Sequence, residues 1–443
     1  MKFIYFFCLL VIVSKIILSC NRADDFVEND KIGIQPTTAF NRTLSGSINR
    51  ITPTQWILNE TASAESEKKR AMLSLTFADQ NPVGLRLHAN TTLIVNVTIL
   101  SGNALPTLII GSYDREAVTI HQLKEGNNSI INPNGGDLYL KFSSDNPSAN
   151  NSVKVDFKEG YSTIPFYILG VNSNAQWKEM LASSSAPNAI LVSHKSFIVC
   201  SREIAKKYEN KNQDLVLSRI DLALNIENSI GYMDVPTPWT GNVMIIERNS
   251  GYMDAESDGK IRVIGSQFER VLDPDVIQNN GWGLFHEMGH HHQMYNWNFD
   301  AVHEVNPNIY TLAVMRTMKP GYKWLTGSNW TDLQKYFEKS SRDYTASTTS
   351  GEVRLALYEQ LRLAFGEGFF INLHKLIRQD RPNATNNEQK MRVLMIYASK
   401  ASGFNLSSYF KKYGFKVNQS IYDEINALNL PNSPTDITTY KEP

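Results

Sequence analysis

The spacing of apolar and polar positions changes along the chain at about residue 170. From about Ala71 to Tyr167, short runs rich in Val, Ile, Leu and Tyr are broken at short intervals by Gly, Asn, Asp and Pro. Short strands with frequent turns are typical of a β-sandwich. The runs that we expect to form strands are TTLIVNVTIL (91–100), LPTLIIGSY (105–113), DLYLKFSS (137–144) and SVKVDFKEG (152–160). Nothing in this part looks catalytic, so we predict a packing or recognition role for it.

Beyond Asn172, apolar residues recur at spacings of three and four, which predicts amphipathic helices. A strand-like interval interrupts them, in GNVMIIERNSGYM (241–253) and KIRVIGS (260–266). Besides a histidine-rich segment near residue 286, the ranges that we expect to be helical are 174–184, 201–233, 306–318, 329–340, 351–379 and 387–402. The predicted fold class is therefore α+β, with an N-terminal β-sandwich domain followed by a mostly helical domain.

The first twenty residues are typical of a targeting segment and are left out of the fold prediction. Lys2 precedes an apolar run, and the segment ends in Ile17-Leu18-Ser19-Cys20. Apolar residues and a small one before cysteine resemble a bacterial lipobox, in which Cys20 is lipidated after cleavage. The apolar run is short and Lys15 interrupts the segment, which argues against a membrane-spanning helix. An ordinary secretory signal is the alternative.

Charge argues against a nucleic-acid-binding protein, and cysteine content argues against a disulfide-stabilised one. Forty-four basic residues balance forty-four acidic ones, so no basic excess favours a nucleic-acid partner. Beyond Cys20 the chain keeps only Cys200, so we expect no internal disulfide. Cys200 lies on an apolar run, SFIVCSREI, and we predict that it is a buried small hydrophobe rather than a nucleophile.

The segment GWGLFHEMGHHHQ (281–293) holds four histidines and a glutamate, and His286 to His290 form an HExxH motif. On a helix, residues four apart lie on the same face, so both imidazoles can reach one ion. Glu287 projects beside them and could accept a proton from a water at that ion. Nitrogen and oxygen ligands with one open position are typical of catalytic zinc. His291 and His292 are rotated by about 100° and 200° from His290, so we do not expect them to bind the same ion.

A third ligand must come from outside this helix. A second helix is expected to begin near HEVNPNIYTLAV (303–314), with Pro307 in its first turn. Glu304 lies at that start and could complete a set of two histidines and one glutamate. His303 is the competing third ligand.

These residues resemble the enhancin-like peptidase family M-sixty, a gluzincin group that has an HExxH motif and a glutamate downstream. Here thirteen residues separate His290 from Glu304. The similarity extends to NSGYMDAESDGKIRVI (249–264), to LALYEQLRLAFGEGFF (355–370) and back to NPVGLRLHANTTLIVNVTI (81–99), so it covers roughly residues 75 to 375. The family has HSG after its GYM, whereas this chain has Asp254-Ala255-Glu256.

The resemblance implies a gluzincin-type catalytic domain with one Zn²⁺ per chain. Its ligands would be His286, His290 and Glu304, so the resemblance favours Glu304 over His303 as third ligand. Glu287 would be the general base and acid. Asn308, four residues after Glu304, would share its helix face and could orient a ligand. A helper that stabilises the tetrahedral intermediate is also expected. The candidates for this helper are Tyr295, His303, Tyr310 and Tyr252.

The family resemblance also implies a substrate class. Members that are bacterial lipoproteins are similar to mucin-degrading enzymes, so we expect cleavage of peptide bonds in extracellular, mucin-type O-glycoproteins. Two alternatives stay open: a carbohydrate-binding adhesin with a structural or vestigial metal site, and a general protease without glycan dependence. The intact Glu287 argues against the adhesin. The tryptophans that we expect in the core rather than stacked on sugars are Trp282, Trp297, Trp324 and Trp330.

The expected domains are a lipoprotein signal peptide (1–19), a tether (20–50), the β-sandwich domain (51–167), the catalytic domain (168–430) and a tail (431–443). We expect a bacterial outer-membrane lipoprotein, held in the membrane through lipidated Cys20. Asp24 and Asp25 resemble the acidic tag of some surface-exposed lipoproteins. Without a lipobox, the protein would be secreted or periplasmic.

Overall fold

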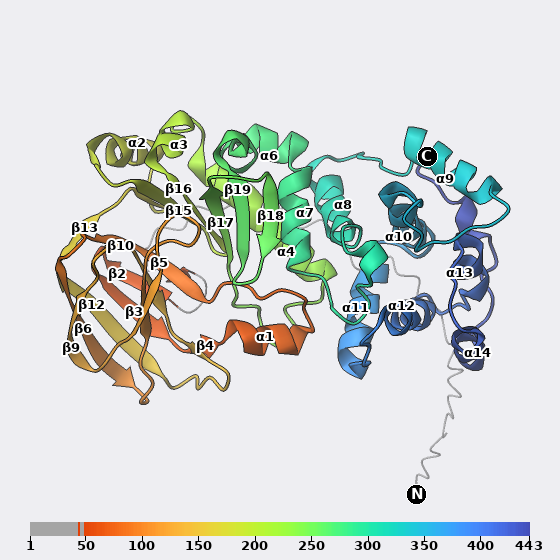
Figure 1. The fold of residues 1–443 in the computed structure, drawn as a ribbon, viewed down its shortest axis with the longest axis horizontal. Helices are drawn as coiled ribbons and strands as arrows, with labels where there is room; N and C mark the ends of the chain where they lie inside the picture. Colours follow the sequence, from red (N-terminus) through yellow and green to blue (C-terminus); the bar gives the residue numbers. More distant parts are fainter. Residues whose placement is uncertain (1–42, 45–47) are drawn as a thin grey trace, which may run out of the picture. The chain divides into compact units, whose positions relative to one another are not determined.

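The computed structural model describes residues 43–44 and 48–443 (Figure 1). The predicted signal peptide, Cys20 and most of the tether lie outside the described residues. Among the residues that are described, no helix has both the length and the apolar character needed to cross a bilayer.

Two antiparallel sheets form the N-terminal part of the described chain. The first sheet consists, in spatial order, of β1 (Thr43–Leu44), β2 (Ile48–Thr52), β3 (Gln55–Asn59), β12 (Ser152–Glu159), β6 (Thr92–Ser101) and β9 (Gly126–Ile131). The second consists of β13 (Tyr161–Thr163), β5 (Gln80–Leu87), β10 (Gly136–Lys141), β7 (Thr107–Ile110) and β8 (Thr119–Gln122). Val95 and Val155 of the first sheet share one buried core with Leu85 and Leu108 of the second, so the two sheets pack face to face. Beside them lie the short pair β4 (Thr61–Ala62) and β11 (Ser143–Ser144) and helix α1 (Ala64–Ala71).

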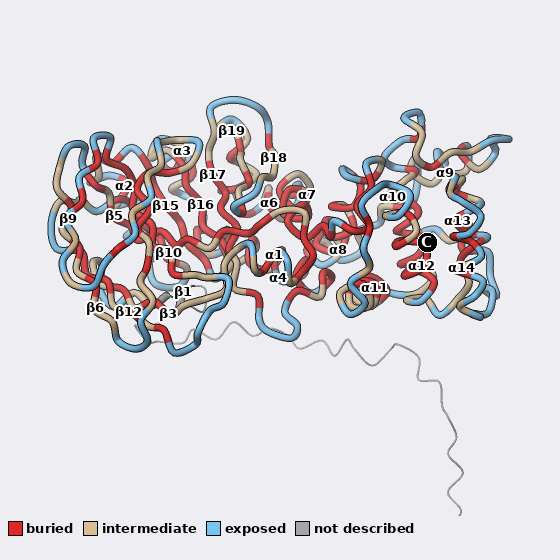
Figure 2. Tube along the Cα trace, turned by 60° about the horizontal axis from the view of Figure 1, so that its bottom comes forward, coloured by how far each residue is buried: buried red, intermediate tan, exposed pale blue. Residues whose placement is uncertain are grey.

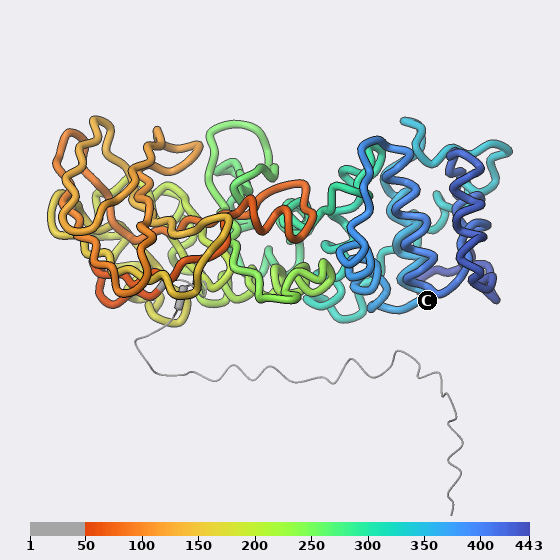
Figure 3. The backbone as a smooth tube through the Cα atoms, turned by 90° about the horizontal axis from the view of Figure 1, so that it is seen from below, coloured from red at the N-terminus to blue at the C-terminus, as the bar shows by residue number. Residues whose placement is uncertain are grey.

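A third, mixed sheet follows and is covered on both faces. Its strands, in spatial order, are β14 (Phe166–Ile168), β15 (Asn188–Val192), β16 (Ser196–Ser201), β17 (Val243–Arg248), β19 (Lys260–Ile264) and β18 (Met253–Glu256). Met244 and Ile246 face the core of the N-terminal sheets, whereas Val243 and Ile245 face a second core shared with helices. In Figures 1 and 3 the green strands accordingly lie between the orange N-terminal strands and the blue C-terminal helices.

Helices of the first group pack on the second face of this sheet. They are α2 (Asn174–Ser183), α3 (Arg202–Lys207), α4 (Gln213–Ile230), α5 (Glu269–Leu272), α6 (Pro274–Asn280) and α7 (Trp282–His290), with a 3-10 turn at Gly265–Gln267. A second group surrounds a third core: α8 (Pro307–Met318), α9 (Gly327–Glu338), α10 (Gly351–Phe365), α11 (Gly368–Asp380), α12 (Asn387–Ser402), α13 (Ser407–Tyr413) and α14 (Gln419–Ala427). Two further 3-10 turns are Asp300–Val302 and Ile437–Thr439. Figure 2 shows the buried stretches of these helices in red.

The predicted mixture of strands and helices is confirmed, and each expected helical range overlaps one or two helices of the structure. The second domain is less helical than predicted, because β15 and β16 were not foreseen. Both strands are buried on both faces, so their sequences lack the alternation that marks a half-exposed strand. Cys200, on β16, is fully buried as expected, and burial raises the pKa of its thiol.

One of the four tryptophans that were expected in the core is fully buried there. Trp297 is 1% exposed, and the other three are partly buried against the apolar cores. None of the four is therefore a freely exposed platform for a sugar.

Candidate metal centre

Helix α7 and the segment before α8 meet at close range and bring the predicted ligands together. Gly289 allows this approach, because a Cβ there would lie 2.6 Å from the carbonyl oxygen of Pro307. Pro307 is the first residue of α8, where its missing N–H costs nothing. Glu304 lies three residues before that helix, in the turn that follows the 3-10 turn Asp300–Val302, rather than in the helix itself.

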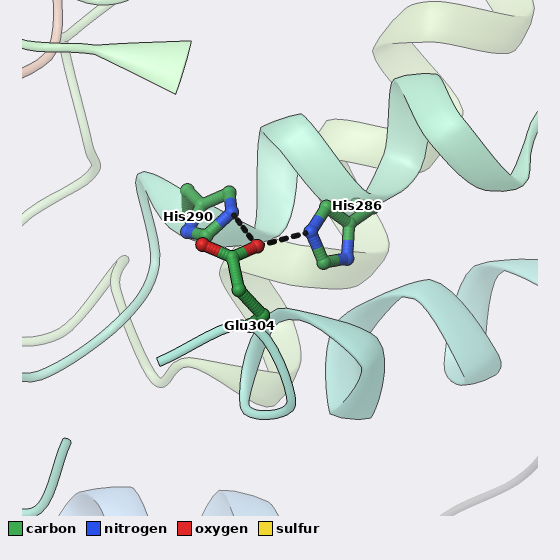
Figure 4. A group of neighbouring side chains, drawn as sticks. All are labelled: His286, His290 and Glu304. Carbon is green, nitrogen blue, oxygen red and sulfur yellow. Dashed lines mark hydrogen bonds and ion pairs between the residues drawn. The ribbon is translucent and has the colours of Figure 1, made fainter. Parts of the chain in front are cut away.

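His286, His290 and Glu304 form one cluster (Figure 4). Oε2 of Glu304 lies 3.2 Å from Nε2 of His286 and 3.4 Å from Nε2 of His290. Potential ligand atoms of all three residues lie within 4.8 Å of one another. The histidine side chains are mostly buried, whereas the Glu304 side chain is 70% exposed, so the cluster opens toward solvent on the Glu304 side.

Two amide side chains determine which ring nitrogens face this cluster. The Asn308 amide nitrogen donates to the carbonyl of Glu304 (3.1 Å), so its oxygen faces Nδ1 of His286 at 2.8 Å. In the same way, the Gln293 amide nitrogen donates to the carbonyl of His303 (2.7 Å), and its oxygen lies 2.8 Å from Nδ1 of His290. An amide oxygen only accepts hydrogen bonds, so both Nδ1 atoms carry a proton.

This arrangement fits a bound cation. In a neutral imidazole with its proton on Nδ1, Nε2 presents a lone pair. The two Nε2 lone pairs and the Glu304 carboxylate then converge without a proton between them, which is favourable only when a positive ion lies there. Two imidazoles and one carboxylate with an open fourth position are ligands that suit Zn²⁺.

The pKa shifts reflect the same convergence. Hydrogen bonding to His286 and His290 holds the pKa of the Glu304 carboxyl well below its usual range. Burial of His286 lowers its pKa, but the bonds to Glu304 and Asn308 outweigh burial, and the net shift is upward. Without a metal, the site would therefore retain protons in place of the ion.

Glu287 lies beside the cluster rather than in it. Its carboxylate oxygen Oε2 is 4.0 Å from Nε2 of His290, and the residue is 9% exposed. Burial raises its pKa above the ordinary value, against the opposing effect of His286 and His290. A carboxylate with a raised pKa is suited to accept and return a proton near neutral pH.

His303 flanks the cluster on its open side. Its Nε2 lies 3.8 Å from Oε1 of Glu304, and its ring centroid is 5.4 Å from that of His290. The Asn298 amide nitrogen lies 3.2 Å from its Nδ1 and, as a donor, leaves the proton of the neutral ring on Nε2. The side chain is 56% exposed and stands outside the group of three converging ligands.

The three tyrosines differ in their placement. Tyr310 is fully buried on α8, and its hydroxyl bonds to the carbonyl of His292 (2.9 Å) and to Nε2 of His374 (2.7 Å). This environment corrects its selection as a helper, because the hydroxyl is held in the core. Tyr252 and Tyr295 are 54% and 42% exposed, so both are accessible to a substrate.

His291 and His292 point into the core. Both are fully buried, and burial lowers their pKa values to about 4 and about 3. His292 bonds to Asn228 (2.8 Å) and lies 3.0 Å from the buried carboxylate of Glu227 on α4. Neither belongs to the converging group, in agreement with the rotation expected on a helix.

The sequence reasoning missed Gln293. It is 1% exposed and follows His290 by three residues, just past the end of α7. Its only signal was an amide within one turn of a ligand histidine, and such an amide is equally common as a helix-terminal residue.

Strand β18 forms an edge of the mixed sheet and lies next to α7. It contains the departure Asp254-Ala255-Glu256, and Asp254 is ion-paired with both Arg248 and Arg262. The Asp254 carboxylate is thus engaged within the sheet.

Comparison with known proteins places the chain in context. The family model described as Peptidase M60, enhancin and enhancin-like, matches residues 160–414, more than half of the chain, and confirms the resemblance seen in the sequence. TRPM8 channel-associated factor 3 of Mus musculus is 24% identical over 315 residues, which cover 70% of this chain and 34% of that protein. The chain thus spans about a third of the length of this curated relative.

Two solved structures share most of the fold. A functionally unknown conserved protein from Bacillus anthracis str. Ames is 25% identical, with a TM-score of 0.78, over 88% of this chain and 81% of that one. A metallopeptidase in complex with Tn antigen is 17% identical, also with a TM-score of 0.78, over 88% of this chain and 80% of that one. At the latter identity, the likeness concerns the fold.

Proposed function

Because the chain belongs to the Peptidase M60 family of enhancin and enhancin-like proteins, we propose that it is a zinc-dependent endopeptidase of extracellular, mucin-type O-glycoproteins. The observation that carries the proposal is the convergence of two bare Nε2 atoms and a carboxylate, with a raised-pKa Glu287 at their side. A structural metal site has no need of that extra carboxylate.

His286, His290 and Glu304 would hold the ion. Bound zinc would supply a Lewis acid that polarises the scissile carbonyl and makes water more acidic. Asn308 and Gln293 would keep each imidazole in the tautomer and orientation that leaves Nε2 free for a ligand bond.

Glu287 would carry the proton. As the water attacks the peptide carbon, its carboxylate would accept the proton and then deliver it to the leaving nitrogen. Burial raises the pKa of Glu287 against the opposing effect of the two imidazoles, which favours its use first as base and then as acid.

His303 would stabilise the developing oxyanion. Its Nε2 lies 3.8 Å from Oε1 of Glu304 on the exposed side of the cluster, where its N–H could donate to an oxyanion. Tyr252 and Tyr295 are the remaining exposed candidates for this helper.

The outer edge of β18 would bind the substrate backbone. No strand pairs with that edge among the described residues, and the strand lies beside the helix that carries Glu287. An extended peptide can add to such an edge through main-chain hydrogen bonds.

Two further observations support the choice of substrate and location. A metallopeptidase of the same fold has been solved with Tn antigen, an O-glycan. We also propose anchoring to the outer membrane through lipidated Cys20, with the enzyme exposed at the cell surface, because this position would give it access to a large extracellular polymer. Replacing Cys20→Ala should release the protein from the membrane fraction and abolish labelling with a fatty-acid analogue.

The test uses a defined O-glycopeptide and its unglycosylated twin. The zinc-loaded wild type should cleave the glycopeptide, and Glu287→Gln should retain zinc but lose activity by about 10²–10⁴-fold. Zinc content without cleavage of any glycoprotein would favour the adhesin alternative. Equal rates on both peptides would indicate a general protease.

A further inference from the structure

A pocket lies between the N-terminal sheets and the start of the mixed sheet. Its volume is about 680 Å³, within the range of small-ligand sites. The residues that line it come mainly from β2, β5, β13, β14 and the C-terminal end of α2. None of them belongs to the cluster of His286, His290 and Glu304. Its charged and titratable lining residues are Arg50, Arg86 and His88, and no acidic residue lines it.

Arg50 is the unusual member of this lining. Its guanidinium carbon lies 5.6 Å from the ring centroid of Trp56 and 5.3 Å from that of Phe166. Its Nε is buried and has no hydrogen-bond acceptor, and the guanidinium makes no ion pair with any described residue. Burial lowers the pKa of this guanidinium.

Arg86, in the same pocket, has its positive charge balanced by carboxylates. It is ion-paired with Glu116 and, at 2.7 Å, with the fully buried Asp137. In the part of the chain that the structure describes, the positive charge of Arg50 has no such counterpart. A partly desolvated cation is stabilised when an anion pairs with it, and the aromatic faces supply only part of that stabilisation.

Beside Arg50, strand β5 packs closely on the ring of Phe166. Gly84 adopts φ +74°, and a Cβ at this position would lie 2.6 Å from the ring of Phe166. Glycine is therefore required for β5 to pass over the ring that supports the guanidinium. The aromatic cradle and the arginine are held together by backbone geometry, not by chance contact of flexible surface side chains.

The lining also includes neutral polar residues. They are Ser162 and Thr163 of β13, beside β5, and Ser183, Ser184 and Ser185 at the end of α2. The Ser183 hydroxyl donates to the carbonyl of Glu179 (2.8 Å), so it offers a ligand only an acceptor. The Ser184 hydroxyl accepts from the Ala186 N–H (3.0 Å), so its proton remains available. Hydroxyls and helix-terminal carbonyls suit a ligand that bears several hydroxyl groups of its own. The guanidinium fork suits a planar or tetrahedral anion, such as a carboxylate or a sulfate.

We propose that this pocket binds an acidic saccharide, with its carboxylate or sulfate on Arg50 and its hydroxyl groups on these serine and threonine residues. The site goes beyond the proposed peptidase activity, since it requires neither zinc nor Glu287. It would give the N-terminal sheets a recognition role toward charged glycans.

The test is a titration of the full chain, by calorimetry or ligand-observed NMR, with four probes. N-acetylneuraminic acid and N-acetylgalactosamine 6-sulfate are the acidic sugars, and N-acetylgalactosamine and inorganic sulfate supply the sugar and the anion alone. We expect the acidic sugars to bind at least tenfold more tightly than either control. Arg50→Met should weaken them at least tenfold, and Ser185→Trp, which fills the pocket from an exposed position in its lining, should do the same.

Two matched variants separate this inference from the proposed function. Lys154→Met removes one positive charge from β12 outside the pocket, and Glu287→Gln disables the proposed peptidase, so both should bind the acidic sugars as the wild type does. Thermal unfolding of each variant establishes that it is folded. No binding of acidic sugars, equally tight binding of inorganic sulfate, or binding unaffected by Arg50→Met and Ser185→Trp would overturn the proposal.

Discussion

At the scale of single residues, two amides connect the candidate ligands to the segment that carries the third one. Asn308 joins the ring of His286 to the backbone of Glu304, and Gln293 joins the ring of His290 to the backbone of His303. Each amide both orients a ring and ties it to the turn before α8. The geometry of the three candidate ligands thus depends on two side chains outside the cluster.

Replacing either amide should weaken zinc binding. We expect Asn308→Ala and Gln293→Ala to lower zinc affinity by about 10–100-fold, because the freed Nδ1 no longer fixes the tautomer and ring orientation. Competition with a chromophoric chelator measures the affinity. Asn279→Ala is the matched control, since its amide nitrogen also donates to a carbonyl four residues earlier (2.9 Å) but contacts no histidine. Equal affinities in all three variants would contradict a positioning role.

His374 should make stability depend on pH. It is fully buried between Tyr310 and the carbonyl of Phe370, and burial, reinforced by Arg378, lowers its pKa to about 3. A histidine whose folded pKa is below its unfolded value of about 6.5 stabilises the fold above pH 6.5, and this contribution is lost as pH falls from there toward 3. The change concerns one proton, so its limiting slope is about 1.4 kcal/mol per pH unit.

The measurement is urea unfolding of wild type and His374→Gln in a chelator at several pH values. Glutamine keeps a donor and an acceptor at this position but does not titrate. From pH 7.5 to pH 5, the wild type should lose about 2 kcal/mol relative to the variant. Parallel curves over this range would show that His374 is protonated equally in both states.

Residue patterns predicted which three side chains cluster better than they predicted the surroundings of the cluster. The helical period alone separated His286 and His290 from His291 and His292, because rotation about an axis is a local property. The burial of Tyr310 and the contact of Gln293 depend on α11 and on the turn before α8, which no local pattern specifies. The roles assigned to Glu287 and Glu304 remain predictions until tested.

At the scale of elements, the site depends on how closely α7 approaches α8. Gly289→Ala should disturb this contact, since its Cβ would lie 2.6 Å from a backbone oxygen and 3.0 Å from Cα of Pro307. Backbone cannot move aside cheaply, so we expect a loss of about 1–3 kcal/mol in unfolding free energy. Displacement of α8 would carry Glu304 with it and weaken zinc binding as well.

Gly283→Ala on the same helix is the control. Its Cβ would meet only the Met253 sulfur, at 3.9 Å, an ordinary contact. Removing a helical glycine there should leave stability unchanged or raise it by about 0.5–1 kcal/mol. Chelator titrations measure the zinc affinity of both variants, and urea unfolding measures their unfolding free energy. Similar losses for the two glycines would mean that helix flexibility, rather than the approach to Pro307, sets their effect.

Elements that are half exposed were predicted best. Strands such as β6 alternate between buried and partly exposed residues, and α12 shows the helical period, so both were visible in the sequence. The buried strands β15 and β16 were not. The long helical range 351–379 is two helices, because Gly366 adopts φ +85° between α10 and α11.

At the scale of the whole molecule, the candidate metal centre joins two apolar cores. Leu284, Phe285 and Met288 of α7 belong to the core beneath the mixed sheet. Val302 and Val305, which flank Glu304, belong to the core of the C-terminal helices. An ion held by His286, His290 and Glu304 would therefore add a connection between two parts of the fold that also pack against each other at α8 and between α4 and α11.

Removal of zinc should consequently loosen the connection and not only abolish activity. At a free zinc concentration one hundred times the dissociation constant, binding stabilises the folded state by about 2.7 kcal/mol, so a chelator should lower the unfolding midpoint. Hydrogen exchange should accelerate most between residues 300 and 306, where the carboxylate would no longer be held. Strands β6 and β12 belong to the N-terminal core, which contains no residue of α7 or α8, so their exchange rates should not change. If exchange rises equally in these strands and in the turn before α8, the ion stabilises the molecule as a whole. If exchange in the turn does not change, the two cores are joined without the ion.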